Sequence, residues 1–172
     1  MSAVKLTDTK IDIEYPMELI LRYFIIKHNK TDFSNYNLSN ELLSDFIDKE
    51  TVKLIQDDNF NLEQEILLFK RVFDLINSEL GENSFKKYNA DKSEFEGMFL
   101  QTAFEGILPG LANNIDYYEG EGRNNLNKKI EGMYSKESFI NAAKRGTKAL
   151  SRIQSLIIFS NDYFSNHGDT RV

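Results

Sequence analysis

Residues 61–81 read NLEQEILLFKRVFDLINSELG, and this stretch decides the fold. Its apolar side chains alternate four and three positions apart, which is the spacing of one helical stripe: Leu62, Ile66, Phe69, Phe73, Ile76 and Leu80. Asn61 stands where an N-cap is expected, with Gln64 in the capping-box position, and Gly81 is placed to end the helix. Three heptads are too few for a free coiled coil, so we predict a long helix packed antiparallel within a bundle.

Two helices are expected before this stretch. One begins near Pro16, because proline fits the first turn of a helix, and it ends after His28. Its apolar positions lie on one face of the helix: Met17, Ile20, Leu21, Phe24 and Ile25. The other runs from near Ser39, the expected N-cap, to about Ile55.

Further helices are expected after it. Residues 93–107 form one, since Ser93 and Glu96 have capping-box spacing, and Pro109-Gly110 interrupts a pattern that resumes toward Tyr117. From Ser135 onward two helical patterns adjoin. Gly146-Thr147 lies between them, and Thr147 is a candidate cap for the second.

These patterns together predict an all-α fold, a compact bundle of about six or seven helices. The alternation of apolar residues before Pro16 fits a short extended N-terminal arm or a brief strand. With only two prolines and no long β-branched alternation, a sheet-based fold is not expected. The length suits one domain, which we place at residues 1–166, with 167–172 as a frayed tail.

Composition narrows the class of protein. There is no cysteine, which excludes disulfides, a thiolate nucleophile and Cys-containing zinc sites. No stretch approaches the roughly 20 apolar residues needed to cross a bilayer, and the N-terminus lacks the apolar core of a secretory signal. A cytoplasmic protein without membrane partners is the expectation.

Charge is distributed unevenly along the chain. The net charge is −6, but residues 1–122 carry 12 Lys and Arg against 23 Asp and Glu, whereas residues 123–152 carry 8 against 2. Such asymmetry suggests a surface for a polyanion or an acidic partner. The alternative is that the basic segment neutralises acidic neighbours within the fold or within an oligomer.

The chain lacks the residue types that the common catalytic motifs require. Two histidines give poor support for a metal site, and the glycines at 120 and 122 belong to an acidic loop that would repel phosphate. Paired acids such as Asp57-Asp58 and Glu63 with Glu65 are typical of a solvated surface. We therefore predict no catalytic residues, no metal and no cofactor for this chain, and no enzyme activity of its own.

Arg22 and His28 form one weak pattern, Arg-x5-His, which fits the loose motif of HEPN-type ribonucleases. On one helix the two side chains lie about 120° apart, so they would converge only across a helix end or a dimer axis. The alternative is structural: Arg22 pairs with Glu18 at i, i+4, and His28 interacts with the helix dipole.

A better candidate for binding is the basic segment near the C-terminus. Lys144, Lys148 and Arg152 recur every four residues, so a continuous helix would present them as one ridge, with Arg145 beside it. Such a ridge would neutralise several phosphates and bind nucleic acid, or another partner, without sequence preference. The alternative is an ordinary amphipathic helix with a solvated face, and a break at Gly146 would remove Lys144 from the ridge.

The order of several short motifs resembles a known family. They are Glu18-Leu-Ile-Leu-Arg22-Tyr-Phe24, Leu43-Ser-Asp-Phe46-Ile47, Phe95-Glu-Gly-Met-Phe99 with Ala103-Phe-Glu105, and Ser138-Phe139 through Arg145-Gly146-Thr147 to Arg152-Ile153. In this order, across about residues 12–165, they resemble the helical C-terminal half of prokaryotic proteins with an N-terminal ParB/sulfiredoxin-like nucleotidase domain. That group includes GmrSD-type, modification-dependent (type IV) restriction proteins.

What the resemblance implies is limited by what the chain lacks. The Asp-Gly-Gln-Gln-Arg motif linked to nucleotide hydrolysis in that family does not occur here, and neither does an HNH nuclease motif. No catalytic residue is carried over. We expect either a truncated chain that begins at the helical region or a free-standing relative that kept only that region.

The function expected from the resemblance is a non-catalytic helical module of a DNA-modification-dependent restriction and phage-defence protein. Its expected partners are DNA, a nuclease subunit or a second copy of the chain. Two alternatives remain open: a HEPN-like ribonuclease using Arg22 and His28, and a regulatory protein-interaction domain that binds no nucleic acid.

Overall fold

A computed structural model describes residues 15–28 and 31–166 of the chain, and in this part helices dominate. Eight α helices are joined by short turns and one two-stranded hairpin, so the all-α prediction is confirmed with slightly more helices than expected. The expected N-terminal arm and the tail at 167–172 lie outside the described residues.

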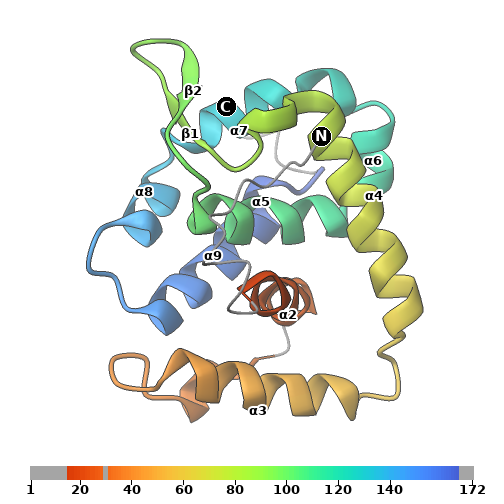
Figure 1. Cartoon of the computed structure of the whole chain (residues 1–172), viewed down its shortest axis with the longest axis vertical. Helices are drawn as coiled ribbons and strands as arrows, with labels where there is room; N and C mark the ends of the chain where they lie inside the picture. Colours follow the sequence, from red (N-terminus) through yellow and green to blue (C-terminus); the bar gives the residue numbers. More distant parts are fainter. Residues whose placement is uncertain (1–14, 29–30, 167–172) are drawn as a thin grey trace.

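The elements follow one another in this order: α2 (Tyr15–His28), η1 (Phe33–Asn35), α3 (Leu43–Ile55), α4 (Leu62–Leu80), η2 (Gly81–Asn83), β1 (Lys87–Asn89), β2 (Glu94–Glu96), α5 (Gln101–Asn113), α6 (Ile115–Glu119), η3 (Arg123–Asn125), α7 (Leu126–Met133), α8 (Glu137–Ala143) and α9 (Ala149–Tyr163). In Figure 1, α5 crosses the middle of the molecule, α2 is seen almost end-on below it, and α4 runs along the right-hand edge.

Helix α5 is the centre of the core, because every residue from 102 to 112 is buried. It packs against α9 on one side and against α2 and α4 on others. A second, smaller apolar cluster joins α2, α3 and α9: Ile25, Ile26, Phe46, Ile47, Leu150, Ile153 and Ile157. Helix α2 therefore lies between the two clusters and contributes buried side chains to both.

Helices α5 and α9 run parallel and approach closely at Gly110. Their paired residues rise together along the chain, from Glu105 with Arg152 to Gly110 with Ser160. A Cβ at Gly110 would lie 2.3 Å from the Ser160 backbone oxygen, and the Gly110 N–H donates to the Ser160 hydroxyl at 2.8 Å. The interruption expected at Pro109-Gly110 is wrong, since α5 continues through it to Asn113.

Helix α4 begins and ends as predicted. The Asn61 side chain accepts the Gln64 N–H at 3.1 Å, and Gly81 follows the last turn with φ +52°. Its buried face is rotated from the expected stripe, however. Leu62 and Ile66 are each 52% exposed, while the buried positions include Val72, Leu75 and Ile76.

The expected N-cap at Ser39 is wrong, because α3 begins four residues later at Leu43. Residues 37–40 form a turn instead, in which the Asn37 side chain accepts the backbone N–H groups of Ser39 and Asn40 at 3.2 Å each. Short polar side chains stabilise such turns in competition with the helix, which explains the later start.

The helix start expected at Ser93 is also wrong. Residues 87–96 form an antiparallel hairpin in which Tyr88 pairs with Phe95, and Ser93 has a positive φ of 55° in its turn. The Asn89 side chain accepts the backbone N–H groups of Asp91 and Lys92, which holds the turn. Helix α5 starts only at Gln101. Helix α7 lies in a stretch for which the sequence pattern predicts no helix.

Candidate nucleic-acid interface

The basic segment is divided by a turn between α8 and α9. Helix α8 ends at Ala143, and α9 begins at Ala149 after Gly146, whose φ of +91° is incompatible with a continuing helix. The Thr147 hydroxyl donates to the Lys144 carbonyl at 2.8 Å and closes the turn, so Thr147 is not the N-cap of α9, a position that Lys148 holds. The continuous helical ridge expected over 144–152 is therefore wrong.

The turn nevertheless gathers three of the four predicted cations at the surface. Lys144, Arg145 and Lys148 are all exposed. None of them forms an ion pair with an acidic side chain within residues 15–28 and 31–166. We call residues 144–148 the basic turn.

Arg152, the fourth predicted cation, has a different environment. It lies in the first turn of α9, its side chain is 18% exposed, and its Nε donates to Glu105 Oε2 at 3.1 Å. The Glu105 carboxylate is fully buried and also accepts from Arg22 Nη1 at 2.9 Å. Arg152 thus belongs to a buried ion cluster and not to the basic turn.

The ion cluster joins three helices, α2, α5 and α9. The Gln101 side chain at the start of α5 donates to Glu105 at 2.6 Å, and Tyr15 at the start of α2 donates to Gln101 at 3.0 Å. The expected ion pair between Glu18 and Arg22 is present and closes the cluster on the α2 side. Two guanidinium groups around one buried carboxylate hold α2, α5 and α9 in a fixed relation.

Much of the remaining positive charge in residues 123–152 is also partnered. Arg123 donates to Glu79 at 2.8 Å, and the Lys129 and Lys136 ammonium groups lie 5.6 and 5.8 Å from the centre of the Tyr163 ring. The suggestion that the basic segment neutralises acidic neighbours therefore holds for its arginines at 123 and 152. It does not hold for the basic turn.

Arg22 and His28 face different partners within the chain. Arg22 is buried between Glu18 and Glu105, whereas His28, at the end of α2, has Nε2 3.2 Å from Glu65 Oε1 and packs edge-on against Phe60. Lys27 shares the same Glu65 oxygen at 2.6 Å. A ribonuclease site would need Arg22 to leave two carboxylates, which is costly for a buried arginine.

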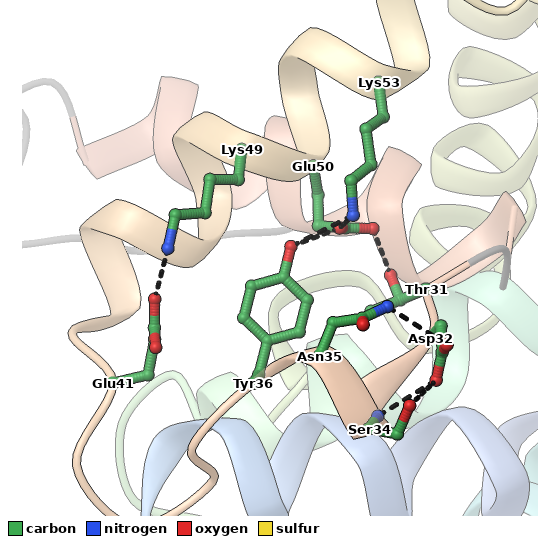
Figure 2. A network of polar contacts seen from close by, with 9 residues as sticks. All are labelled: Thr31, Asp32, Ser34, Asn35, Tyr36, Glu41, Lys49, Glu50 and Lys53. Carbon is green, nitrogen blue, oxygen red and sulfur yellow. Dashed lines mark hydrogen bonds and ion pairs between the residues drawn. The ribbon is translucent and has the colours of Figure 1, made fainter.

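A second polar network, which is not among the sequence predictions, joins the segment between α2 and α3 to α3 around Glu50 (Figure 2). The Glu50 carboxylate accepts hydrogen bonds from Thr31 at 2.6 Å, from Tyr36 at 2.5 Å and from the Lys53 ammonium at 2.5 Å. Burial alone would raise the pKa of Glu50, but these three donors outweigh burial and hold that pKa below its ordinary value. Lys49 and Lys53 also lie over the Tyr36 ring.

The sequence carries a signal for this network. Phe46, Ile47, Glu50 and Leu54 share one face of α3 at helical spacing, and all four are buried. A carboxylate on an otherwise apolar face needs donors from elsewhere in the fold. Both carboxylate oxygens of Glu50 accept hydrogen bonds from side chains of the same chain, which indicates a structural network.

A groove of about 590 Å³ is lined by residues of α8 and α9 and by Lys136 just before α8. Its lining combines apolar side chains with hydrogen-bonding groups: Lys136, Ser138, Asn141, Ala142, Ser155, Ile158, Phe159, Asp162 and Tyr163. Ligand sites in proteins commonly have volumes of about 300–1,000 Å³. No sequence pattern predicts this groove, because it forms only where α8 packs against α9.

Across 15–28 and 31–166, no group of three or more His, Asp or Glu side chains is arranged to hold a metal ion. Within the same residues, no helix has both the length and the apolar composition needed to cross a membrane.

Comparison with known proteins adds no relative. No family model, no curated protein and no solved structure matches this chain. The resemblance to the helical half of GmrSD-type proteins stays a prediction, and only that resemblance suggests a role in restriction, whereas the binding surface is inferred from the chain's own residues.

Proposed function

We propose that this chain is a helical, non-catalytic module of a DNA-modification-dependent restriction and phage-defence protein, and that it binds nucleic acid through the basic turn. The observation that supports the proposal is the exposure of Lys144, Arg145 and Lys148 within five residues, without carboxylate partners among the described residues. Exposed cations of this kind neutralise phosphates and release counterions, which gives salt-dependent affinity.

The charge of the rest of the chain limits where a polyanion binds. Residues 1–122 carry a large excess of Asp and Glu, so most of the surface repels phosphate. Arg22 and Arg152 are engaged with Glu105 and take no part in phosphate contact. Binding would therefore be confined to the α8–α9 end of the molecule, and a short nucleic-acid footprint is expected.

A titration of fluorescent duplex DNA tests the proposal. Binding should be measurable at about 50 mM salt and much weaker at about 200 mM, as phosphate contacts require. The variant Lys144→Gln/Lys148→Gln should lose affinity for all sequences alike, and the slope of log K against log salt should fall by about 2.

A matched variant separates a local contact from a general effect of charge. Lys70→Gln/Lys87→Gln removes the same two charges from exposed positions on α4 and β1 and should bind as wild type. An equal loss in both variants would contradict a specific role for the basic turn. If the chain binds no DNA at low salt and light scattering shows a discrete oligomer, its function would be self-association and not nucleic-acid binding.

A further inference from the structure

We infer that the groove between α8 and α9 receives an unpaired base of a nucleic-acid strand whose phosphates contact the basic turn. This inference depends on the proposed function and specifies its ligand: a single-stranded or locally opened strand. The carrying observation is that the groove and the turn are parts of one helical hairpin. Helices α8 and α9 pack against each other, and Figure 1 shows the loop that joins them at the left of the molecule.

The groove begins close to the basic turn in sequence and in space. Asn141 lines it three residues before Lys144, and Ser155 lines it one helical turn after Arg152. At the other end stand Lys136 and Tyr163, with the lysine ammonium 5.8 Å from the ring centre. A strand lying along the hairpin would thus have cations at both ends of the groove.

The chemistry of the lining suits a base better than a phosphate. Ile158, which is 61% exposed, is the apolar side chain that the groove presents to a ligand, and the buried Ala142 and Phe159 form the floor beneath it. Ser138 and Asn141 offer donors and acceptors of the kind that a base edge needs, and Ser155, whose hydroxyl donates to the Ser151 carbonyl at 3.0 Å, offers an acceptor. Asp162 would repel a phosphate in the groove but accepts hydrogen bonds from an exocyclic amine.

A base in an intact duplex cannot enter such a site. Its faces are stacked and its pairing edge is occupied, so it must be extruded or already single-stranded. Proteins that bind single strands combine a cationic track with apolar or aromatic surfaces on which bases pack, and each packed base contributes about 1–3 kcal/mol. The hairpin provides both parts, with Tyr163 held in place by its hydrogen bond to the Lys129 carbonyl at 2.8 Å.

The test compares a single-stranded oligonucleotide with a duplex of the same length, each labelled at one end. Wild type should bind the single strand at least about tenfold more tightly, consistent with one packed base. Ile158→Ala removes the exposed apolar side chain of the groove, and Ser155→Phe places a bulky ring in the groove; both positions are exposed. Each variant should weaken single-strand binding by about tenfold and leave duplex binding unchanged. A 2-aminopurine base in the strand should gain fluorescence on binding wild type, because it leaves the stack of its neighbours, and should gain less with either variant.

Ile140→Ala provides the matched control. Ile140 is 50% exposed on α8 but does not line the groove, so its truncation should change neither affinity. Equal binding of the two ligands, or groove variants that bind as wild type, would overturn the inference while the loss in Lys144→Gln/Lys148→Gln still supported the proposed function. Absence of binding to both ligands would overturn the two proposals together.

Discussion

The carboxylate of Glu105 lies 2.9 Å from the guanidinium group of Arg22, although 83 residues separate them in the chain. Arg152 completes the contact from α9, so a single buried acid ties together three helices whose sequences give no hint of their proximity. The exposed cations of the basic turn are held on a framework that this cluster orients. The stability of the framework can be tested without any ligand.

Replacing Glu105 with Gln should destabilise the fold by about 3–5 kcal/mol, because the partly buried Arg152 would lose its counter-charge and the buried Arg22 would keep only Glu18. Urea unfolding followed by circular dichroism measures the loss. Glu137→Gln is the control, since Glu137 is exposed in the first turn of α8 and should change stability by less than about 0.5 kcal/mol. Equal stability of the two variants would contradict a structural role for the cluster.

Gly110→Ala should be strongly destabilising for a steric reason. The added Cβ would lie 2.3 Å from the Ser160 backbone oxygen, so α5 and α9 would have to separate. Gly106→Ala on the same helix is a milder test, since its Cβ would meet the Phe139 ring at 3.2 Å, a side chain that can move. Thermal unfolding should give a Tm for Gly110→Ala well below that of Gly106→Ala, and the reverse order would contradict parallel close packing.

The sequence predicts those features of the fold that depend on contacts between residues close together in the chain. Asn61, Gln64 and Gly81 act within a few residues of themselves, so the ends of α4 follow from local chemistry. The capping-box spacing of Ser93 and Glu96 predicts a helix start at residues that form the second half of the hairpin. In the structure Ser93 takes a left-handed conformation in a turn held by Asn89.

In the candidate interface, too, local features can be predicted from the sequence and long-range contacts cannot. The exposure of the three cations in the basic turn follows from the local charge composition and from the turn at Gly146. That Arg152 is partly buried and paired with Glu105 does not follow from the sequence. Arg152 pairs with a carboxylate 47 residues away, and its spacing from Lys148 is the same whether or not that partner exists. The groove likewise depends on how α8 packs on α9, a long-range property that periodicity does not encode.

Stability should fall in acid partly because of Glu50. The donors Thr31, Tyr36 and Lys53 hold its pKa below the ordinary value near 4.5, so the folded chain keeps this carboxylate charged more readily than the unfolded chain does. Its contribution is therefore present above the unfolded pKa and is lost as pH falls through the folded pKa. Urea unfolding at pH 7 and at pH values below the unfolded pKa should show this loss in wild type.

Glu50→Gln should be less stable than wild type at pH 7 and should lose less of its stability on acidification. Tyr36→Phe removes one donor while leaving the carboxylate, so its pH profile should lie between those of wild type and Glu50→Gln. Parallel pH profiles for wild type and Glu50→Gln would show that other carboxylates govern the acid sensitivity.

Gly146→Ala links the shape of the basic turn to binding. Its φ of +91° is strained for any residue with a Cβ, so the turn must change its backbone conformation and displace Lys144, Arg145 and Lys148 relative to one another. Nucleic-acid affinity should fall although no charge is removed.

Gly97→Ala is the matched control, because Gly97 follows the hairpin with φ +84° and likewise has no atom near its added Cβ. Both variants should lose a similar amount of stability in urea, and only Gly146→Ala should weaken binding. Unchanged affinity in Gly146→Ala would show that the cations act through their net charge alone, without a defined arrangement in the turn.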